Sequence, residues 1–245
     1  MIWRVEHFRE IDSTNTWLVK KANEGVDEGL TAYADFQSNG RGRLDRRWES
    51  PTGTSLLCSV LLRPAIDVDQ LQLVVAAVAL AVRAALVRLC GVRPGLKWPN
   101  DLMVENRKLA GLLAEIVTTG DEWGVVVGFG VNLTSSPDPS TSTNVLEASG
   151  VRITPRALLD IVLEELEVRR DSLDSEVGRS ALRDEYERAL LTLGQVVRVE
   201  TLNEVFVGEA CRVDTHGRLV VDTEDGQMKF FVGDVVHLRA QDGAS

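Results

Sequence analysis

The chain has 245 residues, of which 44% are hydrophobic and 26% charged, so it can form one large globular domain or a large and a small one. Its formal net charge of −10 repels phosphate backbones and disfavours a general nucleic-acid-binding protein. Its three cysteines, Cys58, Cys90 and Cys211, form no C-x-x-C pair, which predicts reduced, mostly buried thiols rather than a zinc knuckle or a disulfide framework.

The first half of the chain alternates strand and helix patterns around one long loop. Asp12-Ser13-Thr14-Asn15 offers N-cap side chains for a helix that ends near Gly25. Residues 68–90 predict a second helix, apolar nearly all round, which indicates burial against a sheet. Glu105-Asn106 predicts a tight hairpin turn. Strands are predicted at residues 2–8, 30–36, 55–62, 96–98, 102–104, 109–117 and 123–133, with a loop at 37–54.

In the second half, the predicted secondary structure changes from helix to short strands near residue 193. Residues 134–143 read as a surface loop, and a helical pattern runs from Thr154-Pro155 to about Leu191, with a break at 173–175. Five short β-rich runs between residues 196 and 238 then predict a small barrel. We therefore expect a large domain at residues 1–192 and a small one at 193–245.

No segment favours export or membrane insertion. The N-terminal residues have no apolar signal-peptide stretch. The most apolar run, Leu73 to Val82, is too short to span a bilayer. We expect a cytoplasmic protein without a membrane partner.

The segment from Gln37 to Trp48 carries the first chemical signal. It places Gly40-Arg41-Gly42-Arg43 before Arg46-Arg47-Trp48. Glycine lets a backbone approach a ligand closely, arginine forks suit carboxylate and phosphate oxygens, and tryptophan can stack on an aromatic base. The pattern indicates a mobile loop that closes over an anionic, nucleotide-like ligand; on these residues alone, a solvated basic loop is the alternative.

Three further segments place polar or glycine residues where their chemistry matters. Lys97-Trp98-Pro99-Asn100-Asp101 puts polar groups around a rigid bend, although a plain strand–turn–strand explains it equally well. In Arg107-Lys108-Leu109-Ala110-Gly111, an inward-facing Lys108 would need an anionic partner, whereas an edge lysine that prevents aggregation is the alternative. In Gly128-Phe129-Gly130-Val131-Asn132, the glycines indicate a bulge, close ligand approach, or packing against the long helix.

Together and in this order, these segments resemble the biotin–protein ligase family over roughly residues 9 to 133, in its bacterial short form without an N-terminal DNA-binding domain. Val232-Gly233-Asp234-Val235 is similar to the family's C-terminal barrel. The resemblance implies a mixed α/β sheet covered by helices, of the class II synthetase-like kind, and then an SH3-like barrel. It implies an enzyme that joins biotin to ATP, giving biotinoyl-5′-AMP and pyrophosphate, and transfers biotin to a lysine of a biotin carboxyl carrier protein.

The resemblance also implies roles for individual residues. Lys108 and Arg43 are the expected catalytic residues. The expected biotin-binding residues are Ser13, Thr14, Asn15, Gln37, Gly40, Arg41, Gly42, Arg43, Lys108, Gly111 and Gly128. The expected ATP- or adenylate-binding residues are Arg41, Arg43, Arg46, Trp48, Lys97, Asn100, Asp101 and Asn132. Mg²⁺ is expected with ATP; its ligands are not assigned, although Asp101 is a candidate.

The sequence departs from the family at Asp45, where the family's loop usually carries glycine. Three alternatives remain: a lipoate or octanoate ligase on the same fold, a biotin-sensing repressor, and a catalytically inactive binding module. The chain lacks the consecutive glycines of the lipoate ligase loop, and its ligase-like strand begins at Ile2, so we expect neither a lipoate ligase nor DNA binding. Retention of Lys108 and Arg43 favours an active enzyme. Monomer and homodimer both stay open.

Overall fold

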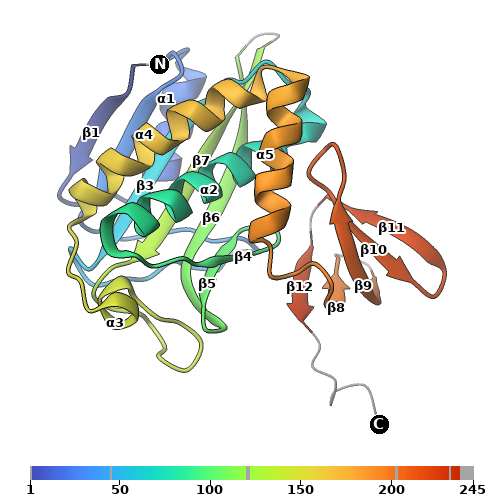
Figure 1. Cartoon of the computed structure of the whole chain (residues 1–245). Coiled ribbons are helices and arrows are strands. Elements are labelled where there is room, and N and C mark those ends of the chain that lie inside the picture. Colours follow the sequence, from blue (N-terminus) through green and yellow to red (C-terminus); the bar gives the residue numbers. More distant parts are fainter. Residues whose placement is uncertain (1, 45, 120–121, 202–203, 232, 238–245) are drawn as a thin grey trace.

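The computed structural model of the chain describes residues 2–44, 46–119, 122–201, 204–231 and 233–237. Asp45, Val232 and the residues beyond His237, about which the sequence raised expectations, lie outside these ranges. The described residues form two sheets: a large one covered by helices, and a small one built from the C-terminal strands (Figure 1).

The large sheet has seven strands in the order β1-β2-β3-β7-β6-β5-β4. β1 and β2 pair in parallel, and the other neighbours pair antiparallel, so the sheet is mixed, as the resemblance implied. The strands are β1 Arg4–Phe8, β2 Leu30–Ala34, β3 Ser55–Leu62, β4 Gly95–Lys97, β5 Asp101–Val104, β6 Arg107–Thr119 and β7 Glu122–Asn132.

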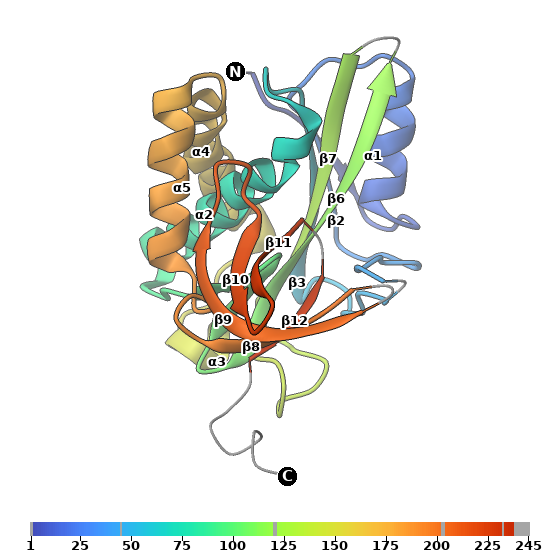
Figure 2. The same ribbon diagram turned by 90° about the vertical axis from the view of Figure 1, so that its right-hand side faces the viewer.

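Helices cover the two faces unequally. α1 (Thr14–Asn23) packs alone against β2, β3, β6 and β7, whereas α2 (Leu71–Cys90), α4 (Pro155–Leu173) and α5 (Glu176–Ala189) form a layer on the opposite face (Figure 2). Among the residues that the structure describes, α1 is the only helix on the first face, so part of that face stays open beside the N-terminus of α1.

α2 is the core helix that its composition predicted. A short 3-10 turn (Val68–Gln70) leads into it, and Gly91 ends it in the left-handed conformation, with φ of 72°. The stretch Val68–Cys90 is apolar and long enough to cross a membrane, but 67% of its most apolar window is buried inside the structure. Its apolar surface contacts α4, α5 and the central strands.

Local sequence signals explain most element ends. Glu105 and Asn106 both adopt positive φ, 50° and 63°, in the predicted hairpin turn between β5 and β6. The Thr154 hydroxyl accepts a hydrogen bond from the Ala157 amide at the start of α4. The expected break separates α4 from α5. The short helix α3 (Val145–Ser149) was not predicted, because five residues are too few to show a helical period.

The C-terminal strands form a five-stranded antiparallel sheet in the order β11-β10-β9-β8-β12. These strands are β8 Val196–Glu200, β9 Val205–Val213, β10 Leu219–Thr223, β11 Gly226–Phe230 and β12 Asp234–His237. The buried Trp98, which precedes a cis Pro99, donates its indole N–H to the Gly217 carbonyl 3.4 Å away. The turn between β9 and β10 therefore packs directly against the part of the chain that forms the large sheet.

Candidate active site

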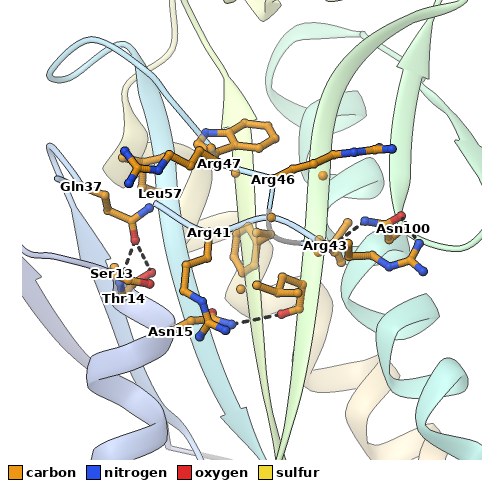
Figure 3. Close-up of a pocket in the computed structure, with 18 of the residues that line it drawn as sticks. Ser13, Thr14, Asn15, Gln37, Arg41, Arg43, Arg46, Arg47, Leu57 and Asn100 are labelled. Atoms are coloured by element: carbon orange, nitrogen blue, oxygen red, sulfur yellow. Dashed lines mark hydrogen bonds between the residues drawn. The ribbon is translucent and has the colours of Figure 1, made fainter. Parts of the chain in front are cut away.

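The candidate site is a hollow on the open face of the large sheet, at a place where neighbouring strands carry glycines. Asp101, Gly111, Gly130 and Leu57 lie in one cross-strand row, because each is the register partner of the next. Gly128 lies two residues from Gly130 and therefore faces the same side. Because these glycines have no Cβ atoms, a depression lies between the Gln37–Trp48 loop and the N-terminal end of α1 (Figure 3).

Trp48 lies on the floor of this hollow. A Cβ on Gly130 would lie 2.4 Å from Trp48 Cε2, and one on Gly111 would lie 3.2 Å from its Cζ3. The two glycines therefore form a flat shelf for the indole ring. Lys108 Nζ lies 5.8 Å from the ring centroid, within cation–π range.

The loop that carries Trp48 folds back on itself as a small hairpin. The Gly42 amide donates to the Arg46 carbonyl at 2.7 Å, and the Trp48 amide donates to the Gly40 carbonyl at 3.1 Å. A Cβ at Gly40 would lie 2.3 Å from the Trp48 carbonyl oxygen, so this glycine allows the two arms of the hairpin to meet. Gly40 acts on the shape of the loop and does not line the pocket.

A β-bulge brings Lys108 into the site. The register of β5 with β6 shifts so that Leu102 pairs with Ala110 but Met103 pairs with Lys108, which leaves Leu109 as the extra residue. Residues 108 and 111 would face opposite sides of a regular strand. Here Lys108 Cε lies 2.9 Å from the Cβ position of Gly111, on the pocket side.

Lys108 has the anionic partner that its position requires. Its Nζ lies 2.6 Å from Asp101 Oδ1, with side chains 36% and 23% exposed. The prediction that an inward-facing Lys108 needs a carboxylate or other anion is confirmed, and the edge-lysine alternative is wrong.

The start of α1 supplies polar groups at the other end of the hollow. Thr14 donates to Gln37 Oε1 from its amide at 2.7 Å and from its hydroxyl at 3.0 Å. The Ser13 hydroxyl caps the helix by accepting from the Thr16 amide at 3.4 Å. Ser13 and Thr14 are 2% and 3% exposed, so this end offers buried, oriented polar groups to a ligand.

Arg43 connects three distant parts of the chain. Its guanidinium donates to Asn100 Oδ1 at 3.2 Å and, at 3.2 Å, to the carbonyl of Gly233, which immediately precedes β12 of the small sheet. In Figure 3 Arg43 points toward Asn100, whereas Arg41 points down toward Asn15. The small sheet thus takes part in placing a predicted catalytic residue.

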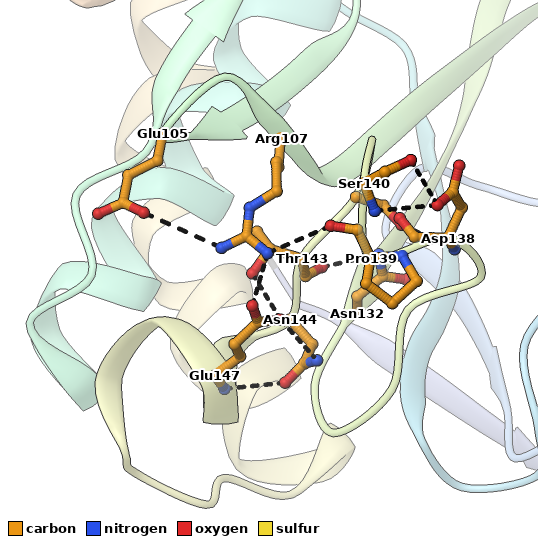
Figure 4. Close-up of polar contacts among 10 residues, drawn as sticks. Glu105, Arg107, Asn132, Asp138, Pro139, Ser140, Thr143, Asn144 and Glu147 are labelled. Atoms are coloured by element: carbon orange, nitrogen blue, oxygen red, sulfur yellow. Dashed lines mark hydrogen bonds and ion pairs between the residues drawn. The ribbon is translucent and has the colours of Figure 1, made fainter.

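A second polar network joins Arg107 to the segment 138–147 (Figure 4), beside the backbone of Lys108. The Lys108 amide donates to the Thr141 carbonyl, and its carbonyl accepts from the Thr143 amide, both at 2.9 Å. Arg107 Nη1 lies 2.5 Å from Glu147 Oε1, and the Thr143 hydroxyl donates to the same carboxylate at 3.2 Å. The hydrogen bond from Arg107 lowers the pKa of Glu147. The segment 138–147 is therefore fixed against the start of β6.

The structure brings together most of the predicted site residues. The predicted residues that line the hollow are Ser13, Thr14, Asn15, Gln37, Arg41, Gly42, Arg43, Arg46, Trp48, Asn100, Asp101, Lys108, Gly111 and Gly128.

Gly40, Lys97 and Asn132 are not among the lining residues. Lys97 lies in β4, where its charge adds to burial in lowering the pKa of His237. Asn132 is 2% exposed and donates to the Thr143 carbonyl at 3.0 Å, while its Oδ1 has no hydrogen-bond partner in the part of the chain that the structure describes.

The roles assigned from the resemblance left out several residues of the site, although Arg47, Phe129 and Gly130 stand in segments that the sequence analysis singled out. Arg47, Leu57, Cys58, Leu112, Leu113, Phe129 and Gly130 also line the hollow. Burial raises the pKa of the Cys58 thiol, which fits a packing residue rather than a nucleophile. The pairing of Gly111 with Gly130 would have indicated a depression in the sheet, but the pairing is known only once the register of β6 and β7 is known.

The lining is strongly cationic in a chain of negative net charge. Arg41, Arg43, Arg46, Arg47 and Lys108 face one carboxylate, Asp101, among the lining residues that the structure describes. Among the residues with described positions, no three or more His, Cys, Asp or Glu side chains are grouped so that they could hold a metal ion. One carboxylate beside several cations suits Mg²⁺ that arrives with ATP and takes most of its ligands from phosphates and water.

A protein-family model described as the biotin/lipoate A/B protein ligase family matches residues 7–132, just over half of the chain. The chain belongs to this family. A second model, for the biotin protein ligase C terminal domain, matches residues 192–238.

Individual relatives in the biotin/lipoate ligase family support the same assignment. The biotin–[acetyl-CoA-carboxylase] ligase of Mycobacterium tuberculosis is 34% identical over 247 residues, covering 97% of this chain and 90% of the relative. The bifunctional ligase/repressor BirA of Escherichia coli is 30% identical, with coverage of 94% and 72%. The biotin protein ligase of Aquifex aeolicus, solved in complex with biotin and ATP, superposes with a TM-score of 0.82 at 26% identity, covering 98% of this chain and all of that one.

Proposed function

We propose that this protein is an ATP-dependent biotin–protein ligase. It condenses biotin with ATP to biotinoyl-5′-AMP and pyrophosphate, and then transfers biotin to one lysine of a biotin carboxyl carrier protein. The observation that carries the proposal is the cationic hollow, which places Lys108 and the loop arginines opposite the buried polar start of α1. An acid with a polar head and an anionic tail matches both ends.

The first step brings two anions together, so it needs positive charge where negative charge gathers. Biotin's carboxylate oxygen attacks the α-phosphorus of ATP, and the bond to the pyrophosphate leaving group breaks. We assign Lys108 and Arg43 to this step, because Lys108 is fixed by Asp101 and by the segment 138–147, and Arg43 by Asn100 and Gly233.

The proposed binding roles divide the hollow into two ends. Ser13, Thr14 and Gln37 would hold the ureido ring, whereas Trp48 on its glycine shelf would lie beside the adenosine. Lys97 and Asn132 lie outside the lining, so their assignment to the nucleotide is carried by the family resemblance alone. Asp101 is the lining carboxylate that could reach Mg²⁺ bound to ATP.

The second step needs no enzyme nucleophile. The amine of the acceptor lysine attacks the carbonyl carbon of the mixed anhydride, AMP leaves, and an amide forms. The loop of residues 37–48 keeps water from this intermediate. Mass spectrometry during turnover is expected to detect no biotin bonded covalently to the ligase.

The wider assignments are also proposals. The two matched family models and the two separate sheets support a catalytic domain at residues 1–192 and an SH3-like domain at 193–245. We also propose a cytoplasmic enzyme without a membrane partner, and the net charge of −10 supports the absence of DNA binding. Sedimentation at several concentrations separates monomer from homodimer, and a DNA-binding assay with biotin and ATP tests the repressor alternative.

The deciding experiment measures pyrophosphate release with ATP and Mg²⁺, offering biotin, lipoate or octanoate in turn to the wild type and to Lys108→Ala. Pyrophosphate release that requires biotin and is lost in Lys108→Ala supports biotin as the substrate acid, adenylation as the first step, and the role of Lys108 in it. Release with lipoate or octanoate instead keeps the fold and rejects the substrate. If no acid supports release, a biotin-binding titration tests the inactive-module alternative.

A further inference from the structure

Glu115 is the one carboxylate in the otherwise apolar stretch 109–117 of β6. It lies on β6, flanked by Ala114 and Ile116, and pairs in register with Val126 of β7. Its side chain is 23% exposed. A carboxylate in such surroundings is costly unless it is paired and hydrogen-bonded, so its partners indicate why it is there.

One partner is Asn15, at the start of α1. Asn15 Nδ2 donates to Glu115 Oε2 at 2.8 Å and to the Leu113 carbonyl at 3.3 Å, while its Oδ1 accepts from the Ser59 hydroxyl at 2.5 Å. A carboxylate only accepts hydrogen bonds, so Glu115 fixes which end of the amide faces β6. Asn15 is 4% exposed, and both its amide hydrogens are engaged by the protein.

The other partner is Arg41, in the loop above the hollow. Arg41 Nη1 donates to Glu115 Oε1 at 2.7 Å, across 74 residues of sequence. The same carboxylate therefore holds a residue of the floor with one oxygen and a residue of the covering loop with the other. Arg41 retains further N–H groups for the ligand, because a guanidinium carries five.

We propose that Glu115 is a positioning residue that ties the Gln37–Trp48 loop to the floor of the site through Arg41. This inference rests on the proposed ligase function. Glu115 acts on the lifetime of the adenylate: a loop held down excludes water until the acceptor lysine arrives. When the loop is released, water attacks the carbonyl carbon of biotinoyl-5′-AMP, the bond to the phosphate oxygen breaks, and biotin, AMP and a proton result.

Glu115→Gln is the matched test, because glutamine keeps the size of the side chain but loses the charge. Pyrophosphate released and biotin transferred to a carrier protein are measured in the same reaction. Wild type is expected to release about one pyrophosphate per biotin transferred. In the variant this ratio is expected to rise on the order of fivefold, as for one weakened charge-assisted hydrogen bond.

A second readout is independent of activity. The loop contains Arg41, Arg43, Arg46 and Arg47, so trypsin can cleave it. Glu115→Gln is expected to speed cleavage within the loop several-fold, as less of the loop is held closed. The control is Glu185→Gln. It removes the same charge from a 2.7 Å ion pair with Arg169, which joins α5 to α4 and does not involve the loop.

The outcomes separate cleanly. A Glu115→Gln enzyme with the wild-type pyrophosphate-to-transfer ratio and wild-type loop cleavage would overturn the proposal. Equal acceleration of cleavage in Glu185→Gln would also overturn it, because the effect would then be general loosening. If Glu115→Gln melts far below the wild type, Glu115→Asp keeps the charge on a shorter stem and is expected to give a smaller change in both readouts. If wild type releases no pyrophosphate with biotin, the proposed ligase function is wrong. The rate of loop cleavage then still tests whether Glu115 holds the Gln37–Trp48 loop to the floor of the site.

Discussion

Alanine at Gly130 is expected to displace Trp48 without breaking the strand. Gly130 does not have a positive φ, so alanine suits its backbone. Its Cβ would lie 2.4, 2.6 and 2.8 Å from three atoms of the indole, and contact distances begin near 3.4 Å, so the ring must retreat by about 1 Å. A misplacement of that size in a positioned site costs up to about 10²-fold in rate.

Gly128 provides a matched variant two residues away on the same strand and face. A Cβ there would lie 2.1 Å from Asn15 Oδ1, which accepts a hydrogen bond from Ser59. Gly128→Ala therefore perturbs the polar end of the hollow, whereas Gly130→Ala perturbs the end beside Trp48. We expect the first to raise the KM for biotin and the second the KM for ATP.

The assay is steady-state pyrophosphate release, with each substrate varied while the other is saturating. Thermal melts of both variants check that the fold is retained. The reasoning is refuted if Gly130→Ala has the wild-type kcat and KM for ATP, or if the two variants change the same substrate's KM equally. Either result would mean that Trp48 and Asn15 do not serve opposite ends of one site.

Three further predictions concern the scaffold. Arg107→Met releases the Glu147 carboxylate and the segment that holds the Lys108 backbone, so kcat should fall several-fold with little change in melting temperature; unchanged kinetics would contradict this. Leu80→Ala removes a side chain that is 1% exposed and should lower the free energy of unfolding by about 2–5 kcal/mol in urea titrations. Burial, together with the charge of Lys97, lowers the pKa of His237, so folding favours the neutral imidazole. The contribution of His237 to the free energy of unfolding is fully present above its unfolded pKa, about 6.5, and is lost as the pH falls below that value. His237→Asn should therefore lose less stability than wild type between pH 7 and pH 5, and equal losses would contradict this.

Much of the fold follows from local patterns that the sequence displays. The apolar run of α2, the Glu105-Asn106 turn and the five short C-terminal strands each carry their signal within a few residues. The strand edges were less predictable: β6 extends through Arg107–Thr119, beyond the apolar run that suggested it. Strand pairing with β5 and β7 sets those ends.

The site was less predictable because it depends on which residues meet across the sheet. Gly130 and Glu115 acquire meaning only when the register places them beneath Trp48 and beside Asn15. The bulge at Leu109 likewise reverses the face that Lys108 would occupy in a regular strand. Arg43 touches Gly233, 190 positions later, which no local pattern indicates.

The contact between Arg43 and the Gly233 carbonyl has a consequence for synthesis of the protein on the ribosome. Domains fold largely from the N-terminus as the chain emerges, and contacts of large sequence separation form late. The sheet, the start of α1 and the contact of Arg43 with Asn100 can form early, but the contact of Arg43 with Gly233 forms only when nearly the whole chain has been made. If Arg43 acts in adenylation as proposed, a nascent or prematurely terminated chain is expected to adenylate biotin poorly, and so to consume little ATP before the enzyme is complete.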